Sequence, residues 1–219
     1  METFISVILP VFNAELTIAR SIKSILNQTF TNFELIIVEN GSTDQTKNII
    51  LEFNDERIIY LELPHANLVA ALNHGIFNSK GKYIARMDAD DFSHEIRLQV
   101  QVDYLEQNND IDLVSGQVNY VGDQSRNEGY FLYVNWANSI KNSEGIYLNR
   151  FCESAIPHPS VMFRKSLGQQ FGFYRQGNFP EDFELWNRWM SQGVRMSKVH
   201  QTVLDWHDSP GRLSRMHSM

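Results

Sequence analysis

Three carboxylates within four residues, Asp88, Asp90 and Asp91, follow an apolar run that is typical of a buried strand. Like charges this close repel each other unless a cation or solvent separates them. Oxygen ligands of this kind suit Mg²⁺ or Mn²⁺, which proteins hold with one or two carboxylates together with phosphate oxygens and water. The alternative is a solvated acidic turn, because a lone Asp-x-Asp is a common sequence.

Other polar segments also follow or precede predicted elements. The first apolar run ends at Pro10–Asn13, and the second leads into Glu39–Asp44. Further along, Pro180 precedes Glu181 and Asp182, a combination that favours the start of a helix. A carboxylate at that place either stabilises the helix N-terminus or removes a proton from a substrate.

The segments that would position these residues alternate between short β-branched runs and helical patterns, which indicates βαβ units and a parallel sheet. Strands are predicted over residues 4–9, 33–38, 58–63, 83–87 and 113–121, and helices over 15–28 and 68–79. Asn13 and Ser93 are predicted N-caps, and Gly81 is predicted to end the second helix. The helix after Ser93 carries Ile96, Val100 and Tyr104 on one face. Ligands of such sheets bind beyond the carboxyl ends of the strands.

Composition sets the broad class. The 219 residues are 42% hydrophobic, which is ordinary for a globular protein, and they form one expected catalytic domain over 1–219 with a core over 1–120 and a looser second half over 121–219. The polar, Arg-containing stretch before Met219 is compatible with a longer native chain.

Charge and cysteine content limit partners and compartment. With 26 acidic and 19 basic side chains the net charge is −7, which argues against a general nucleic-acid binder. One cysteine favours a reducing cytoplasm. No apolar run reaches about 18 residues, so no integral membrane span is expected, although a peripheral contact at the inner face of a membrane fits the sequence.

In order along the chain, six stretches resemble the motifs of family 2 glycosyltransferases. They are Pro10–Asn13, Gln28–Phe30, Glu39–Asp44, Asn73–Gly75, Gly81–Asp91 and Glu181–Asp182. The resemblance implies a GT-A-type nucleotide-binding fold, α/β with a mostly parallel central sheet flanked by helices. It also implies an inverting enzyme that uses Mn²⁺ or Mg²⁺ to move a sugar from a nucleotide-diphosphate donor to an acceptor hydroxyl.

The resemblance implies a donor site in the first half of the chain. The residues at the nucleobase would be Pro10, Val11, Phe12, Asn13 and Glu15. Glu39 stands where the family usually has an aspartate that accepts a hydrogen bond from uracil, so a UDP-sugar is the expected donor. Asp44 either contacts the donor or serves as a helix-terminal acid.

Metal and diphosphate residues follow from the same resemblance. Asp88, Ala89 and Asp90 match the family's Asp-x-Asp, in which the first acid contacts the ribose or a metal-bound water and Asp90 coordinates the metal. Asp91 would lie beside the sugar, on the acceptor side, and Arg86 would hold the donor or pair with a neighbouring carboxylate. In the closing loop, His207 is a predicted metal ligand and Arg212 a predicted phosphate contact.

On the acceptor side, Asp182 is the predicted general base, with Glu181 as its neighbour. Trp186 and His158 are predicted to face the acceptor, against the alternatives of a core aromatic and a turn histidine. The expected acceptor is a glycan or lipid-linked sugar, in cell-surface polysaccharide or glycan biosynthesis.

Two other functions compete with this one. A sugar-nucleotide nucleotidyltransferase would need a glycine-rich, basic phosphate loop after the first strand, and Val11–Asn13 is not one. A catalytically inactive nucleotide-sugar-binding module would keep the pocket without turnover.

Overall fold

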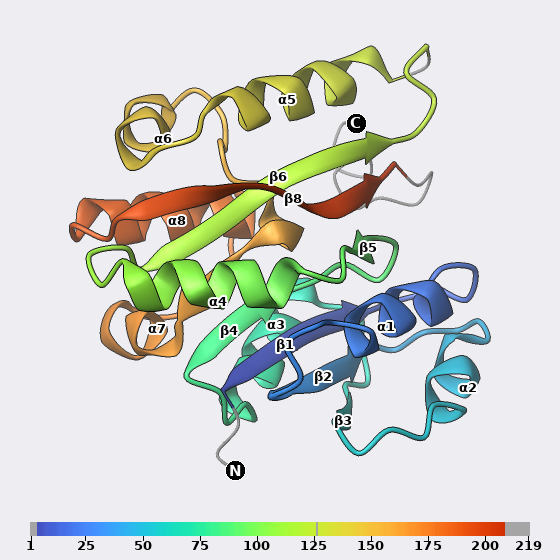
Figure 1. The fold of residues 1–219 in the computed structure, drawn as a ribbon. Helices are drawn as coiled ribbons and strands as arrows, with labels where there is room; N and C mark the ends of the chain where they lie inside the picture. Colours follow the sequence, from blue (N-terminus) through green and yellow to red (C-terminus); the bar gives the residue numbers. More distant parts are fainter. Residues whose placement is uncertain (1–3, 126, 209–219) are drawn as a thin grey trace.

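A computed structural model describes residues 4–125 and 127–208. Its centre is an eight-stranded sheet in the order β3-β2-β1-β4-β7-β6-β8-β5 (Figure 1). The strands are β1 (Ile5–Val11), β2 (Phe33–Glu39), β3 (Ile58–Glu62), β4 (Tyr83–Arg86), β5 (Phe92–Ser93), β6 (Leu113–Val121), β7 (Met162–Arg164) and β8 (Met196–His207). The strands β1 to β4 pair in parallel, as does β6 with β8, whereas β7 and β5 pair antiparallel with their neighbours. The predicted α/β class with a mostly parallel central sheet is confirmed.

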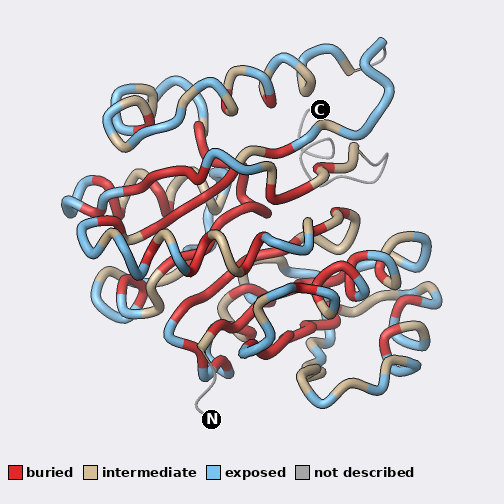
Figure 2. Tube along the Cα trace, viewed as in Figure 1, coloured by how far each residue is buried: buried red, intermediate tan, exposed pale blue. Residues whose placement is uncertain are grey.

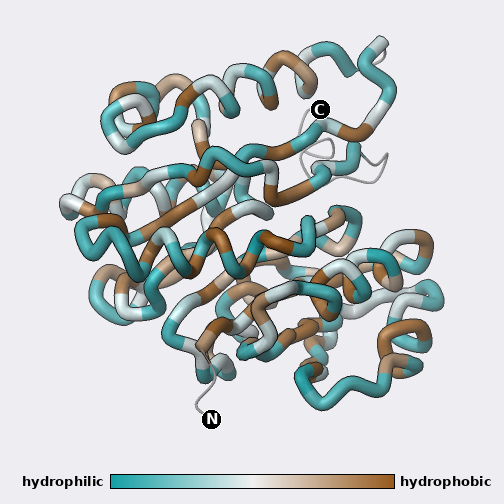
Figure 3. Tube along the Cα trace, in the orientation of Figure 1, coloured by the Kyte–Doolittle hydropathy of each residue, from teal (hydrophilic) through white to brown (hydrophobic). Residues whose placement is uncertain are grey.

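Helices cover both faces of this sheet. They are α1 (Ile18–Leu26), α2 (Thr46–Leu51), α3 (Leu68–Phe77), α4 (Arg97–Gln107), α5 (Glu128–Ser139), α6 (Ser143–Asn149), α7 (Lys165–Phe171) and α8 (Glu181–Ser191), with a short 3₁₀ helix η1 (His158–Ser160). Because side chains alternate along a strand, β1 sends Val7 to the cluster under α1 and α4, and Ile8 to the cluster under α3 and α8. The strands are consequently buried and the outer helix faces exposed, as Figure 2 shows, and apolar colour concentrates on the central elements in Figure 3.

Topology places the two halves of the chain side by side at the site. Strand β4 ends at Arg86, two residues before the first of the three aspartates, and its antiparallel neighbour β7 begins two residues after the end of η1, which carries His158. At the junction, the Arg86 N–H donates to the Val161 carbonyl over 3.1 Å. Residues from the first and second halves of the chain therefore meet across one pair of strands.

Several predicted helix ends are wrong. Asn13 does not cap α1, which begins after Thr17, but takes a left-handed backbone with φ 47°. Ser93 lies in β5, and Gly81 follows a helix that already ends at Phe77, with Asn78 as its C-cap. Gly81 instead approaches β1 so closely that a Cβ would lie 2.6 Å from the Ser6 nitrogen.

The buried face of α4 also differs from the prediction. Ile96 is 43% exposed, whereas Arg97 and Gln101 lie fully inside the protein. The helix is rotated relative to the expected apolar stripe because the interior beneath it offers backbone carbonyls to polar side chains.

Across the described part of the chain, every helix is too short or too polar to cross a lipid bilayer.

Candidate active site

The three aspartates singled out in the sequence, including the predicted metal ligand Asp90, lie together after β4. Each offers a carboxylate oxygen, and these oxygens all lie within 4.8 Å of one another. The loop that carries them is tied to α1, because Arg20 donates to the Asp90 carbonyl over 2.7 Å and Ser21 to the Asp88 carbonyl over 3.0 Å. We name Asp88, Asp90 and Asp91 the aspartate cluster.

Strand β8 completes the aspartate cluster from far along the chain. The His207 backbone N–H donates to Asp91 Oδ1 over 2.8 Å, and Asp91 is fully buried. The His207 imidazole keeps its Nδ1 3.1 Å from the Asp205 carbonyl. Burial and the charge of Arg20 lower the pKa of His207, so its ring favours the neutral form that ligates metals.

A second cluster, which we name the base cluster, consists of His158, Glu181 and Asp182. Its ligand atoms also lie within 4.8 Å of one another. Its histidine already has partners on both ring nitrogens: Nδ1 lies 3.5 Å from Glu181 Oε1, and Nε2 lies 2.7 Å from the Tyr174 hydroxyl. The base cluster is therefore internally paired. Helix α8 starts at its two acids, as predicted, after Pro180.

The two acids of the base cluster have opposite pKa shifts. For Asp182, burial and the neighbouring Glu181 charge raise the pKa above its ordinary value, against the opposing effects of His158 and Arg86. For Glu181, burial also raises the pKa, but the hydrogen bond and charge of His158 outweigh it and lower the pKa to about 2. One carboxylate thus stays ionised while the other is biased towards holding a proton, which is the pattern expected of an acid–base pair.

Arg86 lies between the two clusters. Its guanidinium is 2.6 Å from Asp88 Oδ1, and its side chain is 5% exposed. Burial lowers the pKa of Arg86, but the charges of Asp88 and Glu181 raise it above the ordinary value. Nε and Nη1 have no hydrogen-bond partner among the described residues. Buried donors without partners are rare, and they mark a place where a ligand or water completes the structure.

The predicted nucleobase residues come together where the loops after β1 and β2 meet. Asn13 Oδ1 accepts from the Thr43 N–H over 2.8 Å, and Glu15 Oε2 accepts from the Gln45 N–H over 2.9 Å. Asp44 accepts from the Thr46 N–H over 3.0 Å. Burial raises the pKa of Asp44, but hydrogen bonds from Thr46 and the Glu15 N–H bring it below the ordinary value. These contacts fix the two loops against each other.

Glu39, the predicted base-reading residue, is 2% exposed. Its carboxylate accepts from the Ser42 N–H over 2.6 Å and from the Gly41 N–H over 3.2 Å. Pro10 is buried and Phe12 is 44% exposed beside this loop pair. Ala89 is half-buried between the first two aspartates. Arg212 lies outside the described residues.

Trp186 does not present a face to an acceptor. It is 2% exposed, and its ring packs edge-on against His158 at 5.8 Å between ring centroids. The interpretation as a core aromatic is the one that the structure supports.

Tyr174, which sequence reasoning missed, contacts the base cluster from a segment without any motif spacing.

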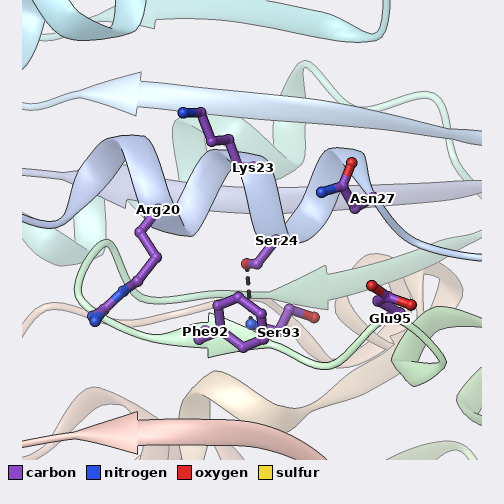
Figure 4. A pocket seen from close by; sticks show the side chains of 7 residues that line it. All are labelled: Arg20, Lys23, Ser24, Asn27, Phe92, Ser93 and Glu95. Carbon is purple, nitrogen blue, oxygen red and sulfur yellow. Dashed lines mark hydrogen bonds between the residues drawn. The ribbon is translucent and has the colours of Figure 1, made fainter.

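A groove of about 320 Å³ runs between α1 and β5, beside the aspartate cluster (Figure 4). Its floor is closed by the Ser93 N–H, which donates to Ser24 Oγ over 3.0 Å. Its two cations, Arg20 and Lys23, point away from each other in the close view. The groove shares Arg20 with the site but adds no converging polar group to it.

Comparisons with known proteins identify the family of the chain. The chain belongs to glycosyl transferase family 2, whose model matches residues 6–171. It is 32% identical over 206 residues to the putative glycosyltransferase EpsE of Bacillus subtilis, covering 91% of this chain and 71% of that protein. It is 31% identical over 209 residues to the O-antigen biosynthesis glycosyltransferase WbnJ of Escherichia coli, covering 92% and 78%.

Solved structures identify the fold as GT-A. S. aureus TarS 1-349 in complex with UDP-GlcNAc superposes with a TM-score of 0.75 at 18% identity, covering 99% of this chain and 62% of that one. Mannosyltransferase PcManGT from Pyrobaculum calidifontis, in complex with GDP-Man and Mn²⁺, gives 0.72 at 17%, covering 97% and 59%. The chain thus spans about three fifths of each solved chain. Its family membership leaves the nucleotidyltransferase alternative without support.

Proposed function

We propose that this protein transfers a sugar, with inversion, from a UDP-sugar to a hydroxyl of a glycan or lipid-linked sugar during polysaccharide biosynthesis. The observation that carries the proposal is the pair of acidic clusters on either side of the buried Arg86. One cluster has the oxygen ligands for a cation, and the other has a carboxylate biased towards protonation. WbnJ, named for O-antigen biosynthesis, and TarS, solved with UDP-GlcNAc, support the acceptor setting and the donor.

The aspartate cluster fits a divalent cation. Its three carboxylate oxygens lie within 4.8 Å of one another, and an all-oxygen ligand set suits Mn²⁺ or Mg²⁺. Asp88 and Asp90 would hold the ion, with His207 as a further ligand. When bound, the ion supplies Lewis-acid stabilisation of the charge that develops on the leaving diphosphate. PcManGT, solved with Mn²⁺, supports the choice of metal.

Asp182 then acts as the general base. The acceptor oxygen forms a bond to the anomeric carbon, the bond from that carbon to the diphosphate oxygen breaks, and the acceptor proton moves to the Asp182 carboxylate. The raised pKa of Asp182 favours this transfer. Tyr174 stays neutral because burial raises its pKa, and its hydroxyl lies 2.7 Å from His158 Nε2. On its other side, His158 Nδ1 lies 3.5 Å from Glu181 Oε1, so the ring is held between the phenol and the carboxylate.

The donor is held by the first half of the chain in this proposal. The loops after β1 and β2 receive the nucleobase, with Phe12 beside it and Glu39 accepting from uracil. Arg86, with its two unpartnered N–H groups, donates to the bound sugar or diphosphate. We assign residues 1–120 to the donor side and 121–219 to the acceptor side of one catalytic domain, which is supported by strands of both regions sharing a single sheet.

The test is UDP release from a panel of UDP-sugars with Mn²⁺. Asp182→Asn should lower turnover by about 100-fold or more, because general-base catalysis contributes that much. UDP binding by calorimetry should stay near the wild-type value. The matched control is Asp103→Asn, on the exposed face of α4, which should keep wild-type turnover.

Two outcomes would contradict parts of the proposal. Wild-type turnover in Asp182→Asn would show that another group takes the proton. Binding of UDP without turnover of any donor, with or without simple sugar acceptors, would favour the inactive binding module.

A further inference from the structure

Arg97 is a buried cation without a salt-bridge partner among the described residues. It is 1% exposed, and each hydrogen bond that it makes goes to a neutral group. Burial lowers its pKa to about 9, although the charge of Asp91 opposes that shift. Charged side chains are almost never buried without a paired charge, because desolvation costs several kcal/mol. Such a residue needs a reason beyond packing.

The contacts of Arg97 converge on the junction between the two halves of the site. Its Nη2 donates to the Arg86 carbonyl over 2.6 Å and lies 3.4 Å from the Val161 carbonyl. Arg86 is two residues before Asp88, and Val161 is three residues after His158. One guanidinium therefore holds the backbone that leads to the aspartate cluster and the backbone that leaves the base cluster.

Gln101, one turn later on α4, extends this arrangement. It is fully buried and accepts from Arg97 Nε over 3.1 Å. Its own amide donates to the Ser160 carbonyl over 2.8 Å and to the Val114 carbonyl over 3.3 Å. The guanidinium and the amide thus form a continuous polar bridge from β4 to η1 and β6.

We propose that Arg97, supported by Gln101, is a positioning residue for sugar transfer that sets the spacing between the aspartate cluster and the base cluster. The inference rests on the proposed function of those clusters. Arg97 touches neither cluster through a hydrogen bond; it acts through the backbone carbonyls of Arg86, Val161 and, by way of Gln101, Ser160. Reacting groups must be held within a fraction of an ångström, since a displacement of about 1 Å can cost on the order of 100-fold in rate.

The experiment compares Arg97→Met, Arg97→Lys and Gln101→Leu with the control Gln99→Ala. Among the described residues, the Gln99 side chain pairs only with Asp103 on the outer face of α4. For each protein we measure kcat for UDP release with Mn²⁺, using the UDP-sugar that the wild type turns over best. We also measure the calorimetric Kd for UDP and the thermal midpoint. Arg97→Met should lose about 10- to 100-fold in kcat while Kd for UDP stays near wild type. Arg97→Lys, which can still reach one carbonyl, should recover part of the loss, and Gln99→Ala should match the wild type.

The inference is overturned if Arg97→Met keeps wild-type kcat, or if kcat, UDP affinity and thermal midpoint fall together, because the second result describes a purely structural residue. Should Arg97→Met not fold, Arg97→Lys and Gln101→Leu decide by the same split between kcat and Kd. A wild type that binds no UDP and turns over no donor would instead defeat the proposed function itself, so the two failures are distinguishable.

Discussion

In both the aspartate cluster and the base cluster the ligand atoms lie within 4.8 Å of one another, but the two clusters differ in the groups that they bring together. In the aspartate cluster, three carboxylates converge, and Asp88 pairs with Arg86. In the base cluster, a histidine lies between a carboxylate and a phenol and satisfies both of its ring nitrogens within the protein. The first arrangement consists of carboxylates alone, whereas the second combines two carboxylates with a histidine.

This difference separates two kinds of acidic site that a search by spacing would treat alike. Carboxylate oxygens that converge without a histidine form a ligand set that suits a hard divalent cation. In an internally paired cluster the two carboxyl groups can differ in pKa. Here Glu181 stays ionised, whereas the pKa of Asp182 is shifted towards protonation. The two clusters should therefore respond differently to metal, to pH and to the loss of one partner.

The largest effect is expected from the aspartate cluster. Asp90→Ala should reduce Mn²⁺-dependent UDP binding by more than the roughly 10- to 100-fold that loss of an outer partner costs a metal site. Calorimetry with and without EDTA measures it: chelation should weaken UDP binding by the wild type and leave Asp90→Ala unchanged.

Asp103→Ala, an exposed change outside both clusters, serves as its control. Equal UDP affinity of wild type and Asp90→Ala in Mn²⁺ would show that the aspartate cluster does not bind UDP through a metal.

The pH dependence tests the base cluster next. Turnover requires ionised Asp182, so activity is lost as pH falls through its raised pKa. Glu181→Gln removes the neighbouring charge that contributes to that increase, so the acid limb of the pH–rate profile should move to lower pH. Glu52→Gln, an exposed acid in the C-cap of α2, should leave the limb in place. A limb that moves to higher pH would contradict the assigned pair.

The same variant has a stability signature. The folded-state pKa of Glu181 is about 2 against an ordinary 4.5, so its contribution to the free energy of unfolding is present above pH 4.5 and is lost as pH falls towards 2. Urea unfolding should find Glu181→Gln less stable than the wild type at pH 7, with the difference closing over that acidic range. A difference independent of pH would assign the loss to packing instead.

The smallest effect is expected at the outer edge of the base cluster. Tyr174→Phe removes the hydroxyl that pairs with His158 Nε2 and should cost about 1 kcal/mol of unfolding free energy, the typical value of one hydrogen bond. Urea unfolding against Tyr147→Phe, whose hydroxyl belongs to a half-exposed ring, provides the comparison. Unchanged stability of Tyr174→Phe would show that the phenol contributes nothing to the pairing.

The sequence predicted the parts of the molecule in which local pattern and motif coincide. The range of β6, residues 113–121, matches the prediction, and so do the strand that leads to the aspartates and the start of α8. Each of these segments combines an apolar run with polar residues at its end, so a few consecutive residues are enough to predict it.

Other parts of the structure depend on contacts between residues that are far apart in the sequence. Strand β5 has two residues, and β8 carries the buried Lys198, which interrupts any apolar alternation. Arg97 and Gln101 look like an exposed helical pair because their acceptors are carbonyls from distant strands. Tyr174 reaches His158 from the loop between α7 and α8. Asn13 has the sequence position of a helix cap, but its side chain accepts from the Thr43 N–H, which comes from the loop after β2.

The pairing of β5 with β8 has a consequence for the order in which the site forms during translation. Chains emerge from the ribosome N-terminus first, so β1 to β4 and all three aspartates are available early. The backbone N–H that binds Asp91 belongs to His207, 116 positions later, and within the described residues β5 pairs only with β8. A nascent chain that has not yet reached Met196 therefore contains the three aspartates without the strand that binds Asp91 and without His207, and cation binding at full strength should appear only when synthesis of β8 is finished.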